Sequence, residues 1–374
     1  MQIIPIASGK GGVGKSLISA NLAIALGQAN KKVVLADLDL GASNLHLVIG
    51  HQAPKVGLGT YLTGQIAFED IIIDTEYPNL RFIPGDSEIP GLTSLKLAQK
   101  KDLIRNLQSL SADYLILDLG AGAHLTILDL FLMTPQAILV TAPTVTATLN
   151  GYLFLKNTVF RMMYNTFGTD SKAFAYLEEI KKDPTSLQKL YVPKLLEKLE
   201  EVDPSNVAVF RRRLNQLKPQ LILNMIDDPR DADKALKIRR SCNEYLGLDL
   251  NHLGVVYRDT MQDKALASRL PIIIYKPQSL LSQSIYRIAE KIMTAKTISF
   301  DADFNSFDQA ESEAEEDFET KISYVEDLLG TGALTTGDLA ETIKSQQYEI
   351  TQLRKENQLL KSKLVKAASQ GFKI

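Results

Sequence analysis

Four of the six residues from Gly9 to Gly14 are glycines, and a strongly helical run follows them directly. The stretch reads GKGGVGKSLISANLAIAL and contains the spacing G-x-x-x-x-G-K-[ST] as Gly9, Gly14, Lys15 and Ser16. Glycines let a backbone curl around a phosphate with its N–H groups inward, and a helix amino end adds partial positive charge. Lys15 would then reach the β- and γ-phosphates, while the Ser16 hydroxyl would ligate Mg²⁺. The stretch predicts a phosphate-binding loop between a strand and a helix.

The residues around the glycines match that order. Ile3–Ala7 is a short apolar run typical of a buried strand, with Pro5 as an irregularity. After the loop, apolar residues recur at helical spacing at Ile18, Leu22, Ala25 and Leu26. A flexible turn without a ligand is the alternative interpretation, and the strand–loop–helix order disfavours it.

Further apolar runs deliver carboxylates to their carboxyl ends. Val33–Ala36 leads to Asp37 and Asp39, and Tyr114–Leu117 leads to Asp118 and a glycine-containing loop. Ligands of open α/β sheets bind at this edge, so the three aspartates are candidates to face a magnesium nucleotide. Asp118 has the form of a Walker B aspartate, which reaches Mg²⁺ directly or through water. Solvated or capping aspartates are the alternative for Asp37 and Asp39.

The remaining runs complete a βα series. Four more strands are expected at 137–141, 221–224, 253–256 and 272–274. The predicted fold is a doubly wound, mostly parallel α/β sheet of the P-loop NTPase kind, over residues 1–296.

Composition limits the class of protein. With 374 residues, 45% of them hydrophobic, and a net charge of -2, the chain can bury a large core and implies no strongly charged partner. The single cysteine, Cys242, excludes a disulfide framework and is expected to be a small apolar core residue. The four histidines lack metal-ligand spacing, and no run approaches the ~18 apolar residues of a membrane span. We expect a cytoplasmic nucleotide-binding enzyme without a signal peptide.

An insertion interrupts the βα series at about 157–216. Apolar residues recur there at helical spacing, and prolines at 184, 193, 204 and 219 are expected to mark element ends, which predicts a small helical subdomain. We expect it to dock a protein partner. Arg211–Arg213 and Arg239–Arg240 could form a basic patch for nucleic acid, but solvated helix faces are the favoured explanation.

The C-terminal part has two further compositions. Residues 297–340 read as an acidic flexible linker, because the stretch from Asp301 to Glu319 holds nine acidic and no basic residues. Residues 341–374 contain heptads with Ile343, Ile350, Asn357 and Leu364 at a, and Gln346, Leu353, Leu360 and Ala367 at d. A single Asn at a favours a parallel two-stranded coiled coil, so we predict a C-terminal coiled-coil helix. A solvated single helix, or one packed on its own domain, is the alternative.

Several of these stretches together resemble the MinD/ParA ATPases with a deviant Walker A motif. The resemblance rests on Lys10 and Lys15 in KGGVGKS, DLDLGASN from Asp37 to Asn44, the DLGAG segment at Asp118, TAP at 141–143 and NM at 224–225. It covers roughly 1–155 and 217–296. The wording is most similar to the FlhG/FleN and MinD-like branch.

The resemblance implies a role for each matched position. Lys10 would cross an ATP-bound homodimer to the partner's phosphates, and Lys15 would hold the nucleotide in cis. Ser16 and Asp118 would organise Mg²⁺. Asp39 would position the attacking water near that ion, with Asp37 in support. Asn224 would recognise the adenine edge. The nucleotide would also be contacted along the loop, by Gly9, Lys10, Gly11, Gly12, Val13, Gly14, Lys15, Ser16 and Leu17.

The chain departs from the family pattern at three positions. Leu17 stands where the family often has a second threonine, and Thr144 and Asn150 stand where MinD and FlhG usually carry Glu and Asp. Those acids lie toward the family's dimer interface. Neither the activating N-terminal tail typical of FlhG nor the basic membrane-targeting helix that closes MinD is expected.

The resemblance implies a slow ATPase that binds ATP/ADP with Mg²⁺ and acts as an ATP-dependent dimer switch. Its expected role is to position a cellular structure of the flagellar, cell-division or polar machinery. A ParA-like, DNA-associated partition ATPase and a scaffold ATPase of the same superfamily are the alternatives. Iron–sulfur carriers of the superfamily need cysteines that this chain lacks.

Overall fold

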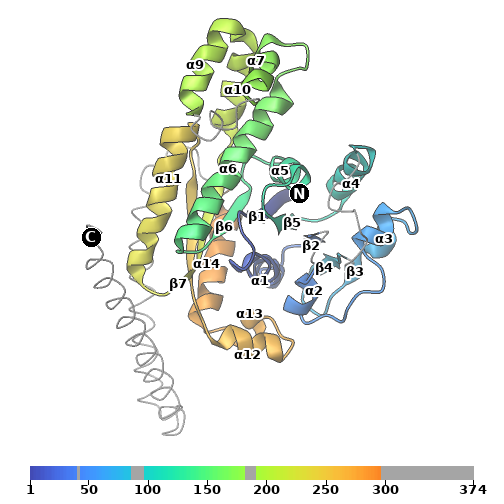
Figure 1. The fold of residues 1–374 in the computed structure, drawn as a ribbon. Helices are drawn as coiled ribbons and strands as arrows, with labels where there is room; N and C mark the ends of the chain where they lie inside the picture. Colours follow the sequence, from blue (N-terminus) through green and yellow to red (C-terminus); the bar gives the residue numbers. More distant parts are fainter. Residues whose placement is uncertain (40–42, 86–96, 182–190, 296–374) are drawn as a thin grey trace, which may run out of the picture. The chain divides into compact units, whose positions relative to one another are not determined.

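The computed structural model describes residues 1–39, 43–85, 97–181 and 191–295. Within them, one eight-stranded sheet has the order β3-β4-β2-β5-β1-β6-β7-β8, and all neighbours are parallel except β3 and β4 (Figure 1). The strands are β1 (Gln2–Ser8), β2 (Val33–Leu38), β3 (Ile73–Asp74), β4 (Leu80–Ile83), β5 (Tyr114–Ala121), β6 (Ile138–Thr141), β7 (Gln220–Ile226) and β8 (Asn251–Tyr257). The predicted doubly wound, mostly parallel sheet is confirmed.

Helices cover both faces of the sheet. The strands are buried on both sides, so Val33 and Leu35 of β2 join one apolar cluster while Val34 and Ala36 join the other. One face carries α1 (Lys15–Gln28), α2 (Leu45–Val48), α12 (Met261–Ala267), α13 (Ile272–Tyr275) and α14 (Leu280–Thr294). The other carries α3 (Leu58–Leu62), α4 (Leu97–Ser109), α5 (Leu125–Phe131), α6 (Val145–Thr166), α7 (Lys172–Lys181), α9 (Val192–Val202), α10 (Pro204–Gln216) and α11 (Asp233–Leu246).

One predicted strand is wrong. The isoleucines at 272–274 belong to the short helix α13, which begins after Pro271. Ile272 and Ile273 are fully buried, and the Ile273 amide donates to Asn21 Oδ1 of α1 at 3.1 Å. The run therefore packs on α1 as a helical turn. The prediction failed because periodicity does not distinguish a buried strand from a buried helical turn of this length.

Most of the inserted residues that the structure describes are helical. The first of them continue α6, which already begins at Val145, and α7, α9 and α10 follow. Pro193 and Pro204 lie in the first turns of α9 and α10, where a proline costs no helical hydrogen bond. Pro184, Leu187 and Leu190 lie outside the described residues, as do the predicted linker and coiled coil.

The insertion shares a core with the rest of the domain. α10 packs against α6, and α9 packs against α7, α10 and α11. Phe210 of α10 is fully buried with its ring centroid 5.9 Å from that of Phe167, next to the end of α6. In Figure 1 these helices gather around the far end of α6. Removing the insertion would therefore expose apolar faces of α6 and α11.

A buried carboxylate joins three helices beside the sheet. Asp129 of α5 accepts hydrogen bonds from Arg161 Nε at 2.7 Å and Nη2 at 2.8 Å, both from α6, and from Lys100 of α4. Asn165 Nδ2 adds a fourth donor at 3.3 Å. Burial raises the pKa of Asp129, but the donors from Arg161, Lys100 and Asn165 outweigh it, so the pKa lies below its usual 3.8.

The Asp129→Asn variant is expected to lose about 3 kcal/mol of unfolding free energy at pH 7, because two partly buried cations lose their counter-charge. Since the folded pKa lies below 3.8, this difference is present at neutral pH and shrinks as pH falls below that value. Urea unfolding measures it. The control is Glu200→Gln, whose exposed partner Arg211 lies 2.9 Å away and which should cost under about 0.5 kcal/mol. Equal losses of unfolding free energy in both variants would contradict the role of Asp129 as the counter-charge of Arg161 and Lys100.

Candidate nucleotide-binding site

The glycine loop between β1 and α1 has the backbone that its sequence predicts. Gly12 and Gly14 have φ values of 79° and 81°, in the left-handed region that favours glycine. A Cβ at Gly11 or Gly12 would meet nothing within 4 Å, so the loop has an open side. A Cβ at Gly9 would lie 2.1 Å from the Asn150 carbonyl oxygen, so the loop is packed directly on α6.

Lys15, Ser16 and Asp118 converge where α1 begins and β5 approaches its end. Lys15 Nζ lies 2.8 Å from Asp118 Oδ1, and the Ser16 hydroxyl donates to Asp118 Oδ2 at 2.7 Å. Lys15 and Asp118 are 6% and 1% exposed, so the ion pair is largely shielded from water. A lysine, a hydroxyl and a carboxylate beside an open glycine loop are the groups that a magnesium-bound phosphate chain requires.

Ser19 belongs to the same cluster, although the sequence patterns did not single it out. Its hydroxyl donates to Asp118 Oδ1 at 2.6 Å, and the residue is fully buried. Ser19 lies one turn after Ser16 on the same face of α1. The sequence signal that was available is the position of this hydroxyl, three residues after Ser16 and thus on the same side of α1.

Asp37 lies opposite Asp118 on the neighbouring strand. Burial, and then the negative charge of Asp118, raise the pKa of Asp37 to about 6. Its oxygens accept from the Asp39 amide at 3.1 Å, the Ser43 hydroxyl at 2.7 Å and the Leu45 amide at 3.2 Å. Asp37 thus organises the turn after β2 and supports Asp39.

Asp39 lies beside the loop that follows Asp118. A Cβ at Gly120 would be 3.3 Å from Asp39 Oδ1, so the carboxylate lies against the backbone of the DLGAG segment. The turn therefore brings Asp39 to the same edge as the Lys15–Asp118 pair. Residues 40–42 lie outside the described ranges.

Asn224 connects β7 to the glycine loop. It is 2% exposed, and its Nδ2 donates to the Val13 carbonyl at 2.8 Å. A Cβ at Gly14 would lie 2.2 Å from that nitrogen. Met225 follows with φ of 59°, a left-handed value rare for a side-chain-bearing residue, where the β7–β8 register shifts. Of the remaining loop positions, Leu17 packs against the apolar cluster on the α1 face of the sheet.

Lys10 lies apart from the Lys15–Asp118 pair. It is exposed, and its Nζ donates to Thr146 Oγ1 in the first turn of α6 at 3.3 Å. Thr144 caps α6, since its Oγ1 accepts from the Ala147 amide at 3.3 Å. Of the departures from the family pattern, Thr144 therefore has a structural role as the cap of α6, whereas Asn150 contacts the glycine loop through its backbone.

An exposed apolar stripe runs along α6 from the point where Lys10 touches it. Val145, Leu149 and Leu153 are 82%, 55% and 40% exposed and are spaced four residues apart, on one side of the helix. We call these residues the α6 stripe. Leu125, at the start of α5, is also 62% exposed. Such a row of large apolar side chains is typical of an interaction surface.

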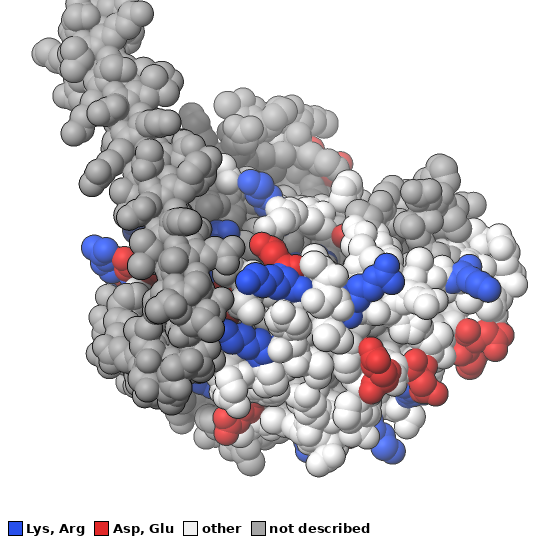
Figure 2. Space-filling model, turned by 90° about the horizontal axis from the view of Figure 1, so that it is seen from below, with Lys and Arg blue, Asp and Glu red and all other residues white. Residues whose placement is uncertain are grey.

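The other residues that the sequence analysis considered lie outside the nucleotide site. Cys242 is buried, and burial raises the pKa of its thiol to about 12, as expected of a core residue. In the insertion's arginine cluster, Arg211 pairs with Glu200 at 2.9 Å and Arg213 donates to Thr166 Oγ1 at 3.1 Å. These partners within the insertion favour a solvated helix face over a nucleic-acid patch. Figure 2 shows a different face, seen from below, where basic and acidic residues are interspersed. Among the described residues, no metal-binding group of three His, Cys, Asp or Glu is found, and no helix could span a membrane.

Comparison with known proteins agrees with this geometry. The family model described as the CobQ/CobB/MinD/ParA nucleotide binding domain matches residues 4–344. The flagellum site-determining protein YlxH of Helicobacter pylori is 27% identical over 294 residues, covering 77% of this chain and 80% of that protein. The antiactivator FleN of Pseudomonas aeruginosa is 29% identical, covering 42% and 56%, and the septum site-determining protein MinD of Synechocystis is 33% identical, covering 39% and 55%.

Solved structures share the fold. The septum site-determining protein MinD of Pyrococcus horikoshii, complexed with Mg-ADP, superposes with a TM-score of 0.53 at 23% identity, covering 79% of this chain and 97% of that one. MinD in the MinC:MinD complex of Aquifex aeolicus gives a TM-score of 0.51 at 19% identity, covering 81% and 100%.

Proposed function

Because this chain belongs to the CobQ/CobB/MinD/ParA nucleotide-binding family, we propose that it is a slow ATPase whose ATP-bound form is a homodimer. The observation that carries the proposal is the buried Lys15–Asp118 pair with Ser16, set beside the open glycine loop. Relatives with this domain include two site-determining proteins, so we assign this chain a role in positioning a cellular structure from the cytoplasm.

The described residues fit Mg·ATP. The loop amides from Gly9 to Leu17 would face the phosphates, and Lys15 would offer its ammonium to the terminal two. Ser16 and Asp118, whose Oγ and Oδ2 atoms lie 2.7 Å apart, would be the Mg²⁺ ligands, and Asp39 would act near the ion through water. Magnesium supplies charge neutralisation on the phosphates. Asn224 fixes the loop through Val13 and would recognise the adenine edge.

Hydrolysis requires a second copy. Lys15 is already committed to Asp118 in its own chain, whereas Lys10 is exposed and touches only a threonine hydroxyl among its described contacts. A lysine supplied across a dimer would complete the charge on the phosphates, while Asp39 orients the attacking water. The α6 stripe begins beside Lys10, so a single dimer interface could bury the stripe and also bring Lys10 to the partner's phosphates.

Leu149→Asp is expected to weaken ATP-dependent dimerisation at least about 10-fold, because it places a charge in the middle of the α6 stripe. ATP affinity of the monomer should stay within about 3-fold, since Leu149 is exposed and no atom lies within 4 Å of a Cβ at Gly11 or Gly12 on the loop's open side. Sedimentation with a non-hydrolysable ATP analogue measures the dimer. The control is Leu266→Asp on α12, which changes an apolar side chain of similar exposure, 43%. Equal weakening by both variants, or none by Leu149→Asp, argues against this interface.

We further propose that residues 341–374 tether two ATPase domains as a parallel coiled coil through the acidic linker 297–340. Removing 341–374 should make the nucleotide-free protein monomeric and make ATPase activity depend more steeply on protein concentration, because the domains would lose their high effective concentration. Sedimentation velocity at micromolar concentration measures this. A nucleotide-free, full-length monomer would exclude the tether.

The insertion is proposed to dock a protein partner. Its core is continuous with α6 and α11, so charge changes on the exposed sides of α7 and α9 test this role better than a deletion. A DNA-associated partition ATPase is the second candidate function, and salt-sensitive, ATP-dependent binding to nonspecific DNA would favour it.

A further inference from the structure

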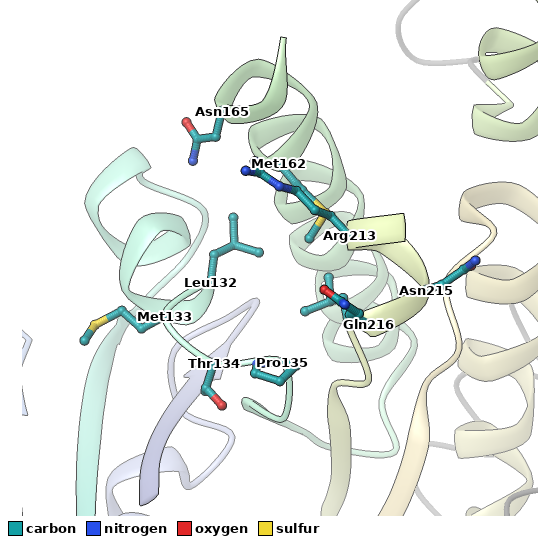
Figure 3. Close-up of a pocket in the computed structure, with 10 residues that line it drawn as sticks. Leu132, Met133, Thr134, Pro135, Met162, Asn165, Arg213, Asn215 and Gln216 are labelled. Carbon is teal, nitrogen blue, oxygen red and sulfur yellow. The ribbon is translucent and has the colours of Figure 1, made fainter. Parts of the chain in front are cut away.

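A cavity of about 540 Å³ lies where the insertion meets the sheet (Figure 3). It is lined by residues that come just before β6 and β7 in the chain, so it lies at the amino ends of these strands. There the Lys218 amide donates to the Pro135 carbonyl at 2.8 Å. The glycine loop follows the carboxyl end of β1, so in this parallel sheet the cavity and the nucleotide site lie at opposite edges. The cavity is therefore separate from the proposed ATP site.

The lining combines an apolar wall with one cation. Leu132, Met162 and Leu217 supply apolar surface, and Arg213 of α10 extends over the cavity near Met162 and Asn165 (Figure 3). Arg213 is exposed and donates to the neutral Thr166 hydroxyl, so within the described part of the chain its charge is not matched by a carboxylate. Arg212, its neighbour on α10, is exposed as well. Such a site suits an apolar side chain flanked by acids.

The described chain ends at the same edge of the sheet. Ile288 of α14 lies against the middle of β8, since a Cβ at Gly254 would be 2.7 Å from Ile288 Cγ1. Tyr286 of the same helix donates to Gln28, the last residue of α1, at 2.9 Å. α14 therefore runs toward the amino end of β8, where Asn251 pairs with Gln220 at the start of β7. Residue 295 thus lies toward the same edge of the sheet as the cavity, on the face that carries α1.

The sequence that follows has the matching chemistry. Residues 300–308 read FDADFNSFD, with three phenylalanines interleaved with three aspartates and no basic residue. Phe304 is the ninth residue after Ala295, so an extended chain spans about 30 Å between them. We propose that this segment docks in the cavity of its own chain, with Phe304 or Phe307 against Met162 and the aspartates toward Arg213. Covalent attachment gives the segment an effective concentration of about millimolar.

The test uses a fluorescently labelled peptide of residues 299–310 and full-length protein. The Phe304→Ala/Phe307→Ala protein, whose own segment no longer competes, should bind the peptide at least 10-fold more tightly than the unmodified chain. Adding Arg213→Glu should weaken peptide binding at least 10-fold, whereas the matched Arg212→Glu should change it less than 3-fold. Gln216→Trp, which fills the cavity from an exposed position of its wall, should also abolish binding.

Three results would overturn the proposal. They are equal peptide affinity for the unmodified and doubly substituted chains, equal effects of Arg213→Glu and Arg212→Glu, and a concentration-dependent association lost with the two phenylalanines. The last result would assign the segment to a second copy. Thermal melting of each variant checks that the domain remains folded.

Discussion

Lys15→Ala is expected to lower the affinity for ATP at least about 100-fold, a loss of about 2.7 kcal/mol. Lys15 is largely buried and lies 2.8 Å from Asp118, so it is held at the start of α1 where the phosphates would lie. Removing it deletes the cation that the open glycine loop cannot replace with amides alone. Titration of a fluorescent ATP analogue measures the loss.

The removal of Lys15 also leaves Asp118 buried without its cation, so stability must be followed separately. Lys15→Met keeps most of the side-chain volume and should show the same loss of ATP affinity with a melting temperature closer to that of the unmodified chain. Lys10→Ala is the matched control for charge, since it removes an exposed lysine of the same loop. ATP affinity retained by both Lys15 variants would contradict the assigned role.

Lys10→Ala is expected to lower ATP hydrolysis at least about 100-fold while leaving ATP affinity within about 3-fold, since one charged group stabilising the transition state is worth this much. In one chain Lys10 reaches Thr146 on α6, away from the Lys15–Asp118 pair. Phosphate release by the purified protein measures the rate. Full activity of this variant would exclude the trans-lysine mechanism.

Mixing two inactive variants distinguishes action in trans from action in cis. Asp39→Ala should bind ATP and persist as the dimer without hydrolysis. In a mixed dimer with Lys10→Ala, the site with an intact Asp39 receives Lys10 from the other chain, so activity should return. If Lys10 acts within its own chain, neither site of the mixed dimer is complete and the mixture stays inactive.

The parts of the fold that could be predicted were those encoded locally. Val33–Ala36 and Tyr114–Leu117 are continuous apolar runs because parallel strands are covered on both faces. β3 and β4 were missed, since Ile73–Asp74 has two residues and Leu80–Ile83 is interrupted by Arg81. The error at 272–274 arose because burial against α1, which a local pattern does not contain, decided the conformation.

The residues of the candidate site also fall into those that local sequence could predict and those that only packing brings together. The glycine loop with Lys15 and Ser16 has a fixed spacing, and Asp118 follows a continuous apolar run within β5, the strand beside β1. The contact of Asn224 with Val13 joins residues 211 apart, and only the packing of β7 brings them together. Ser19 was missed because a hydroxyl one turn into an apolar helix has the same local pattern whether or not a carboxylate faces it.

The absence of room for a side chain at Gly9 has a mechanical consequence. Because the Asn150 backbone is in direct contact with the loop at Gly9, a shift of Gly9 toward α6 would displace the amino-terminal part of that helix. That helix has 22 residues and is about 33 Å long, and it carries Met162 and Asn165 at its other end. α6 thus connects the glycine loop to the cavity. A displacement of the loop would shift both the α6 stripe and the cavity that Arg213 lines.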